Sequence, residues 1–165
     1  MTTSGLLSGW ATAQGLKERI VGTWLAVSQY VDQDRKKLEP FGANPKGIVV
    51  YDSNGYFVLL LQRATLPKFQ SNNRLAGTIE ENRAVVQGSI AYFGKYSIDE
   101  KEHRINLHYD GSTFPNWDAK IKSDSLKSSG TNLTHKPGFS GRRRNSSSFS
   151  KAGKVVIAPA NHAFN

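Results

Sequence analysis

Residues 46–63 read KGIVVYDSNGYFVLLLQR, two runs rich in Val, Ile, Leu, Tyr and Phe around the polar stretch Asp52-Ser53-Asn54-Gly55. β-Branched and aromatic residues are enriched in strands, and Asn-Gly supplies the positive φ that a tight hairpin turn needs. The stretch therefore predicts a β-hairpin with strands over 46–51 and 56–63. It is the strongest local signal of structure in the chain.

The segments around this hairpin extend the same pattern. Leu16 to Val21 is typical of a helical turn, and Gly22 to Val31 of a strand. Thr78 followed by Glu81 forms a capping box, which predicts a helix to about Gln87. Residues 90–98 and 104–110 are predicted strands, the second with strict apolar–polar alternation. These elements predict a mainly β domain.

The positive charge is confined to one part of the chain. The net charge is +9, but residues 1–119 hold 13 Lys/Arg and 12 Asp/Glu, whereas residues 120–151 hold eight Lys/Arg, one Asp and nine Ser. Such a composition cannot bury a core and favours disorder. We predict a flexible segment over 1–15, an incomplete folded domain over 16–118 and a largely disordered or irregular basic tail over 119–165. Within that tail, Val155-Val156-Ile157 is compatible with a short strand.

Several classes of function find no support in the sequence. Cysteine is absent, the histidines have no metal-ligand spacing, and no phosphate loop or nucleophile elbow occurs. No signal peptide or spanning segment is evident, which favours a cytoplasmic protein. Arg142-Arg143-Arg144 lacks the interleaved aromatics of a nucleic-acid surface, so we expect no nucleic-acid and no membrane partner.

The order of several short motifs resembles the small lipocalin-like domain family of bacteria and fungi. Gly22-Thr23-Trp24 after a helical turn resembles the lipocalin Gly-x-Trp opening. The other matching pieces, in family order over about residues 16–118, are Glu39-Pro40-Phe41-Gly42, Asn44-Pro45-Lys46-Gly47-Ile48, Tyr51-Asp52, Gly55-Tyr56, Pro67-Lys68-Phe69, Ala91-Tyr92-Phe93-Gly94-Lys95-Tyr96 and Phe114-Pro115-Asn116-Trp117.

This resemblance implies an antiparallel, calycin-type up-and-down β-barrel with one short helix between strands three and four. It also implies an interior suited to one small apolar molecule, and no cofactor. The family continues with about three strands after Trp117, where this sequence departs from the pattern, so we expect those strands to be degraded or disordered. Because a one-base shift turns TCN serine codons into Phe, Leu, Ile or Val codons, we hypothesise a frameshift or gene-model error near residue 119.

Alternation along the first strand predicts which side chains enter the barrel. The resemblance places Trp24 across the barrel floor, which is a structural role. Counting outward from it in steps of two sends Ala26, Ser28 and Tyr30 inward. Ser28 and Tyr30 are therefore candidate ligand contacts.

Further candidate site residues lie on the later strands and the long loop. Arg63 can orient a carbonyl or carboxylate of a ligand, or form a salt bridge on the rim. His108 is either solvated or, with a tyrosine and Arg63, an acid–base group. The catalytic candidates are His108, Tyr96 and Arg63. The candidate ligand-binding residues are Ser28, Tyr30, Tyr51, Arg63, Phe69, Arg74, Tyr92, Tyr96 and His108.

Three functions are consistent with these residues. The first is a barrel that binds a small hydrophobic molecule, such as a secondary-metabolite intermediate. The second is a cofactor-free cyclase or isomerase of polyketide- or terpenoid-type intermediates, which would hold a reactive conformer by shape. The third is a basic tail that recruits nucleic acid. A homodimer is left open.

Overall fold

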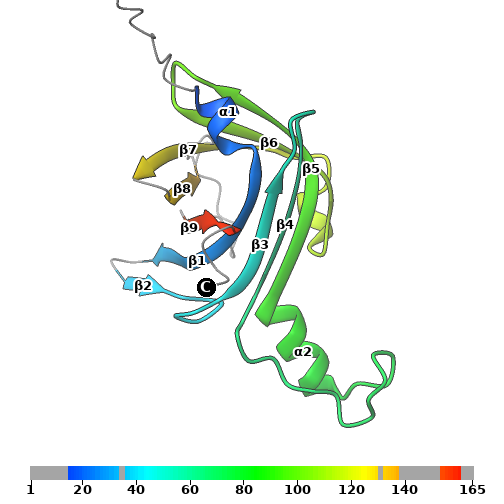
Figure 1. Ribbon diagram of the computed structural model, residues 1–165. Coiled ribbons are helices and arrows are strands. Elements are labelled where there is room, and N and C mark those ends of the chain that lie inside the picture. The colour runs from blue at the N-terminus through cyan, green and yellow to red at the C-terminus, as the bar shows by residue number, and fades with distance from the viewer. Residues whose placement is uncertain (1–14, 34–35, 130–131, 138–152, 161–165) are drawn as a thin grey trace, which may run out of the picture.

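The computed structural model describes residues 15–33, 36–129, 132–137 and 153–160 (Figure 1). Most of the predicted N-terminal segment and the Arg142–Arg144 cluster lie outside these residues. In chain order, the elements are α1 (Leu16–Ile20), β1 (Gly22–Gln33), β2 (Lys36–Leu38), β3 (Lys46–Tyr51), β4 (Tyr56–Gln62), α2 (Ile79–Gly88), β5 (Ser89–Asp99), β6 (Arg104–Ser112), the 3-10 turn η1 (Pro115–Trp117), β7 (Ile121–Ser129), β8 (Asn132–Pro137) and β9 (Gly153–Pro159).

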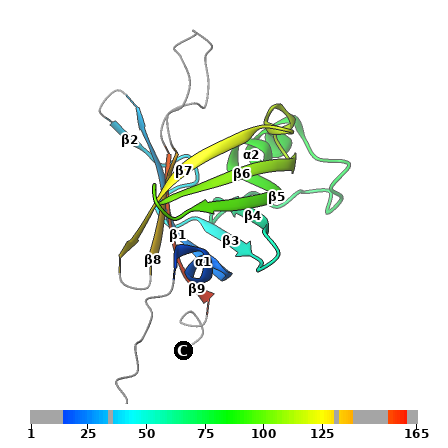
Figure 2. The same cartoon turned by 90° about the horizontal axis from the view of Figure 1, so that it is seen from above.

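The strands form one antiparallel barrel. Their order in the sheet is β2-β1-β3-β4-β5-β6-β7-β8-β9, and β9 also pairs with β1. This last pairing closes an eight-stranded barrel and leaves β2 as an additional strand that projects from the wall (Figure 2). Closure satisfies the backbone groups that an open sheet would leave at its two edges. The predicted up-and-down barrel, with its helix between the hairpin and the next long strand, is confirmed.

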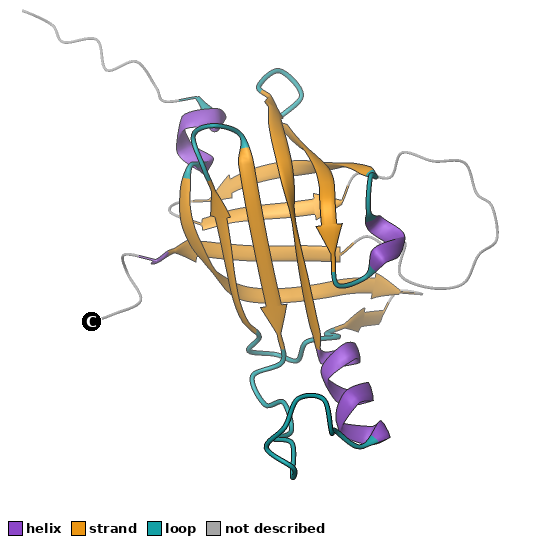
Figure 3. Cartoon of the chain, turned by 90° about the vertical axis from the view of Figure 1, so that its right-hand side faces the viewer, coloured by secondary structure: helices purple, strands orange, loops and turns teal. Residues whose placement is uncertain are grey.

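The expectation that the strands after Trp117 are degraded or disordered is wrong, although the short strand expected at Val155-Val156-Ile157 is present as part of β9. Residues 121–129, 132–137 and 153–159 form β7, β8 and β9, so the barrel is complete (Figure 3). Strand β7 pairs with β6 and β8, and β9 pairs with β8 and β1. Neighbouring strands impose extended structure on a serine-rich sequence whose own propensity is weak, because each new strand completes a ladder of backbone hydrogen bonds. The frameshift hypothesis was meant to explain missing strands after residue 119, and these strands are present.

The predicted hairpin and capping box are confirmed in detail. Gly55 has a φ of 89°, and the Asp52 carboxylate accepts hydrogen bonds from the backbone N–H groups of Asn54 and Tyr56 at 2.7 and 3.1 Å. At the start of α2, the Thr78 hydroxyl accepts from Glu81 N, and the Glu81 carboxylate accepts from Thr78 N. Both features are local, which explains why the sequence alone could predict them.

Helix α1 covers one end of the barrel, and α2 lies beyond the other (Figures 1 and 3). Ile20, the last residue of α1, and Trp24 of β1 are both buried, and the Trp24 indole Nε1 donates to Ile20 O at 2.8 Å. Glu100, in the β5–β6 turn, accepts hydrogen bonds from Leu16 N and Lys17 N and so holds the helix N-terminus against the barrel. The α1 end is therefore the closed floor.

Side chains on β4 alternate between the interior and the outer surface. Phe57, Leu59 and Leu61 are buried, whereas Val58 and Leu60 are 45% and 43% exposed. The buried side chains of β4 therefore form part of the apolar interior of the barrel. No helix among the described residues is long and apolar enough to cross a membrane.

Candidate functional site

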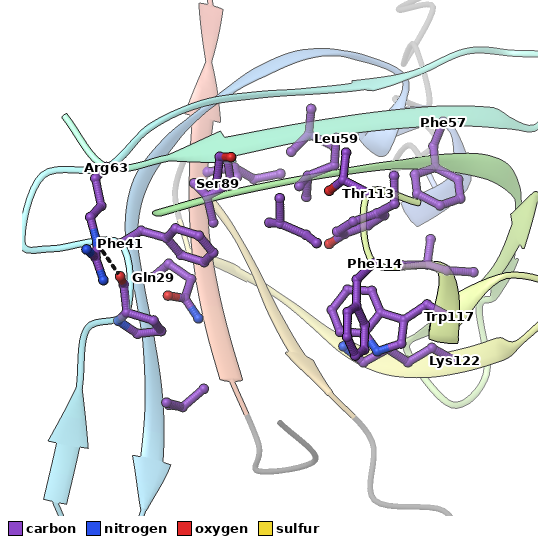
Figure 4. Close-up of a pocket in the computed structure, with 18 of the residues that line it drawn as sticks. Gln29, Phe41, Phe57, Leu59, Arg63, Ser89, Thr113, Phe114, Trp117 and Lys122 are labelled. Carbon is purple, nitrogen blue, oxygen red and sulfur yellow. Dashed lines mark hydrogen bonds between the residues drawn. The ribbon is translucent and has the colours of Figure 1, made fainter. Parts of the chain in front are cut away.

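The barrel encloses a cavity of about 690 Å³, whose lining at one end includes Val85, Val86 and Gln87 of α2. Its volume lies within the range of sites for small organic ligands, roughly 300–1,000 Å³. Apolar side chains from both halves of the barrel form most of the wall, with a few polar groups among them. The lining residues labelled in Figure 4 include Gln29, Phe41, Phe57, Leu59, Arg63, Trp117 and Lys122. Tyr51, Tyr92 and Asp124 also line the cavity.

Aromatic side chains form a continuous wall on one side of the cavity. The Tyr92 ring meets the Tyr109 ring edge-on at 5.1 Å and the Phe57 ring edge-on at 6.0 Å between centroids. Trp117 stacks on Tyr109 at 5.8 Å, and Tyr51 continues the wall beyond Phe57 at 6.2 Å. These contacts fix the rings against one another, so the wall is preformed rather than assembled by a ligand.

A β-bulge in β1 overturns the predicted orientation of Ser28 and Tyr30. Ala26 pairs with Ile157, but the next paired residue is Ser28, so Val27 is an additional residue in the strand. An extra residue shifts alternation by one position. As a result Gln29 and Val31 line the cavity, and Ser28 and Tyr30 do not.

Gln29 brings a polar group into the apolar interior. It is 8% exposed, and its Oε1 accepts no hydrogen bond from any residue that the structure describes. A buried polar atom without a partner costs roughly 1–3 kcal/mol. A ligand that donates a hydrogen bond here recovers this cost, so Gln29 is a natural polar contact in the cavity. Sequence reasoning missed it because the bulge has no signature in the local sequence.

Asp124 places a carboxylate in the same cavity. It lies on β7, is 4% exposed, and faces inward between Lys122 and Leu126 on the same strand. The register pairs it with Ile105 of β6, which is fully buried. The sequence analysis assigned this residue to a disordered tail. The only local signal for an inward-facing residue was the two-residue spacing to Leu126.

Three phenols lie close enough to Asp124 to be affected by its charge. Burial raises the pKa of Tyr51 well above its ordinary value, and Tyr92 and Asp124 add to the effect. Burial and the charge of Asp124 also raise the pKa of Tyr92. For Tyr109, burial again has the largest effect, followed by Tyr92 and Asp124. All three hydroxyls therefore stay protonated near neutral pH and can act as hydrogen-bond donors.

Arg63 stands at the mouth of the cavity, where Figure 4 shows it beside Phe41. Its Nε donates to Pro40 O at 2.9 Å, and its backbone N donates to Gly88 O at 2.8 Å at the end of α2. Arg63 thus joins the loop after β2, the end of β4 and α2. Of the predicted site residues, Arg63, Tyr51 and Tyr92 line the cavity.

The remaining predicted residues lie away from the cavity. Tyr96 is at the floor, where its hydroxyl donates to Asp52 O at 2.7 Å. His108 is on the outer surface and its Nδ1 lies 3.0 Å from Asp110 Oδ1. Phe69 and Arg74 belong to the loop before α2, and neither lines the cavity. The proposed grouping of His108, Tyr96 and Arg63 is therefore not present, because the polar face of β6 is the outer one.

The described residues contain no group of three or more His, Cys, Asp or Glu side chains that could hold a metal ion. Residues 21–157 match the protein family described as lipocalin-like domain. The match covers β7 and β8 and reaches into β9, beyond residues 16–118 that carry the sequence motifs. No curated protein matches the chain.

Proposed function

Because the chain belongs to the lipocalin-like domain family, whose barrel is a ligand-binding domain, we propose that the cavity binds one small, largely apolar molecule of the secondary-metabolite type. The observation that carries this proposal is the preformed cavity of about 690 Å³ with its aromatic wall. Flat, unsaturated or polycyclic molecules suit such a wall, because ring faces and edges contribute beyond simple burial of area. Binding requires no cofactor.

The polar groups define how such a molecule is oriented. The neutral and anionic polar groups of the cavity come from Gln29, Asp124 and tyrosine hydroxyls. Its lining also includes two cationic side chains, those of Arg63 and Lys122. A ligand with an apolar body and one or two oxygen-containing groups satisfies both sets. Few, well-placed polar groups in an apolar cavity are typical of specific small-molecule sites.

Two neighbouring leucines of β4 allow a direct test of binding inside the barrel. Leu59 faces the cavity and is 7% exposed, whereas Leu60 faces outward and is 43% exposed. The apolar dye N-phenyl-1-naphthylamine gains fluorescence when it leaves water, and titration with it measures affinity. We expect Leu59→Arg to weaken binding by at least about tenfold, because it places a charge in an apolar site. Leu60→Arg should leave the affinity unchanged.

A third variant guards against misfolding of Leu59→Arg. Leu59→Trp keeps the site apolar but fills part of it, and we expect a several-fold loss of dye affinity with the near-ultraviolet circular dichroism retained. Equal dye affinity in the wild type and in folded Leu59 variants would show that the dye binds outside the barrel. That result would contradict the proposal that the cavity binds a small apolar molecule.

A cofactor-free isomerase or cyclase of polyketide- or terpenoid-type intermediates is the second candidate. His108, Tyr96 and Arg63, the catalytic candidates from the sequence, do not lie together. The buried carboxylate of Asp124 and the phenolic donors near it favour such an enzyme. Paired groups of this kind can move protons without a cofactor. A homodimer and a cytoplasmic location stay predictions, which light scattering on the purified protein and imaging of a tagged chain would test.

A further inference from the structure

The buried carboxylate of Asp124 is the feature of the cavity that ligand binding alone does not require. An ionised group placed in an apolar interior loses its hydration, and such groups are concentrated at functional sites. Asp124 is 4% exposed and lines the cavity on a strand whose outward residues, such as Ser123 and Ser125, are ordinary partly exposed positions. Its position therefore points toward chemistry with the ligand.

Tyr92 supplies a hydrogen-bond donor on the same cavity. Its side chain lines the cavity from β5, and its hydroxyl makes no hydrogen bond with the part of the chain that the structure describes. Its ring is held edge-on against Tyr109, Phe57 and Trp117 at centroid distances of 5.1, 6.0 and 5.7 Å. Tyr109, whose buried hydroxyl is likewise unpaired among the described residues, adds a second phenol behind it. The donor is therefore fixed by packing before any ligand enters.

We propose that this cavity catalyses proton transfer at a carbon next to the carbonyl of an apolar ketone, with Asp124 as the base and Tyr92 as the donor to the carbonyl oxygen. The inference rests on the proposed binding function and names the substrate class of the same site. A carboxylate that removes a proton needs a partner to stabilise the charge that develops on oxygen. Asp124 and Tyr92 both line the one cavity of about 690 Å³, so a single small molecule held there can contact the two groups.

The reaction balances without an oxidant, a reductant or a cofactor. The α-carbon–hydrogen bond breaks, and the proton moves to the Asp124 carboxylate. The electron pair of that bond forms a carbon–carbon double bond, while the carbonyl π electrons move to the oxygen, which accepts a hydrogen bond from Tyr92. The protonated Asp124 then returns a proton to the same carbon, or to the far end of a conjugated enolate, which isomerises the ketone.

Hydrogen–deuterium exchange in 2-tetralone measures the first half of this reaction. The ketone is apolar, is small enough for the cavity and carries exchangeable protons beside its carbonyl. In deuterium oxide, the loss of these proton signals in the nuclear magnetic resonance spectrum gives the rate. We expect the wild type to accelerate the exchange above buffer. Asp124→Asn should lose at least about 100-fold of that acceleration, within the range typical of a general base.

Two further variants separate catalysis from general damage. Tyr92→Phe should lower the exchange rate by roughly 10- to 100-fold, because it removes one donor to the developing oxyanion. Asp110→Asn is the matched control, since Asp110 is an exposed aspartate that pairs with His108 on the outer surface. It should exchange like the wild type. Folded Asp110→Asn should also bind 2-tetralone within about threefold of the wild type.

The outcomes distinguish this inference from the proposed function. If N-phenyl-1-naphthylamine binds inside the barrel but the wild type does not bind 2-tetralone or exchanges it no faster than buffer, only the proton-transfer inference fails. If neither compound binds, the ligand-binding function fails as well. Exchange by folded Asp124→Asn at the wild-type rate would also overturn the assignment. Should Asp124→Asn not fold, Asp124→Glu moves the carboxylate by one methylene, and at least about a tenfold loss is expected.

Discussion

Replacement of Ile157 by alanine tests whether the serine-rich C-terminal third closes the barrel. Ile157 lies on β9 and is fully buried, and its register places it opposite Ala26 of β1 and Leu133 of β8. Ile121, at the start of β7, is the same residue type but is 72% exposed. The two isoleucines therefore differ in burial within one segment of sequence, and Ile121→Ala is the matched control.

The magnitude follows from the carbon atoms that are removed. Ile→Ala deletes three side-chain carbons, which at about 0.8 kcal/mol each amounts to roughly 2.4 kcal/mol of lost transfer free energy. The residual cavity adds to this, since buried Ile→Ala substitutions cost roughly 2–5 kcal/mol. We expect Ile157→Ala to lower the free energy of unfolding by about 3 kcal/mol, or the Tm by roughly 6–12 °C for a domain of this size. Ile121→Ala should stay within about 0.5 kcal/mol.

Urea denaturation, followed by both circular dichroism and tryptophan fluorescence, measures these differences. Both probes should report one transition, with equal slopes for the two variants. If Ile157→Ala lost no more stability than Ile121→Ala, β9 could not be part of the packed core. The barrel would then be open between β1 and β8, and the enclosed cavity would have no basis.

Three further predictions concern other parts of the barrel. Burial raises the pKa of Tyr51, Tyr92 and Tyr109 in the folded state above the ordinary value of 10. The free energy of unfolding is therefore unaffected by these groups below pH 10 and falls as the pH rises above it. Their phenolate absorbance should appear only when the protein unfolds. Hydrogen bonds from Lys17 N and then Leu16 N lower the pKa of Glu100. Glu100 therefore stabilises the folded state above pH 4.5, and this stabilisation is lost as the pH falls through the lowered pKa. Glu100→Gln should increase amide hydrogen exchange in α1. Gly94→Ala should destabilise the β5–β6 pairing by about 2 kcal/mol or more, because the added Cβ would overlap His108 O and lie 2.9 Å from Asp110 N.

Each of these predictions has an outcome that contradicts it. Phenolate absorbance from all six tyrosines near pH 10 in the folded protein would show that none is buried as described. If Glu100→Gln left the amide protection of α1 unchanged, the Glu100 carboxylate would not be what holds α1 against the floor of the barrel. For Gly94→Ala, the control is Ser97→Ala, at an exposed position on the same strand. Equal unfolding free energies for the two would refute the close approach of β5 and β6.

Several features of the fold depend only on residues that are close together in the chain. The hairpin over residues 46–63, the capping box of Thr78 and Glu81, and the alternation of β6 were all predicted, because turn chemistry, capping and side-chain periodicity act within a few residues. The ordered motifs around Trp24 and after it also predicted the barrel family. Arg63, Tyr51 and Tyr92 were placed at the site, since they lie on these well-determined strands.

The closure of the barrel and the set of side chains that face its interior depend on contacts between distant segments of the chain. The bulge at Val27, in the pairing of β1 with β9, places Gln29 rather than Ser28 at the cavity. Strands β7 and β8 gain their extended structure from partners distant in the chain, which no local pattern encodes. Asp124 enters the cavity only through that closure. Strand pairing is a non-local interaction, and Lys122 and Asp124 of the site lie on β7, a strand whose structure depends on it.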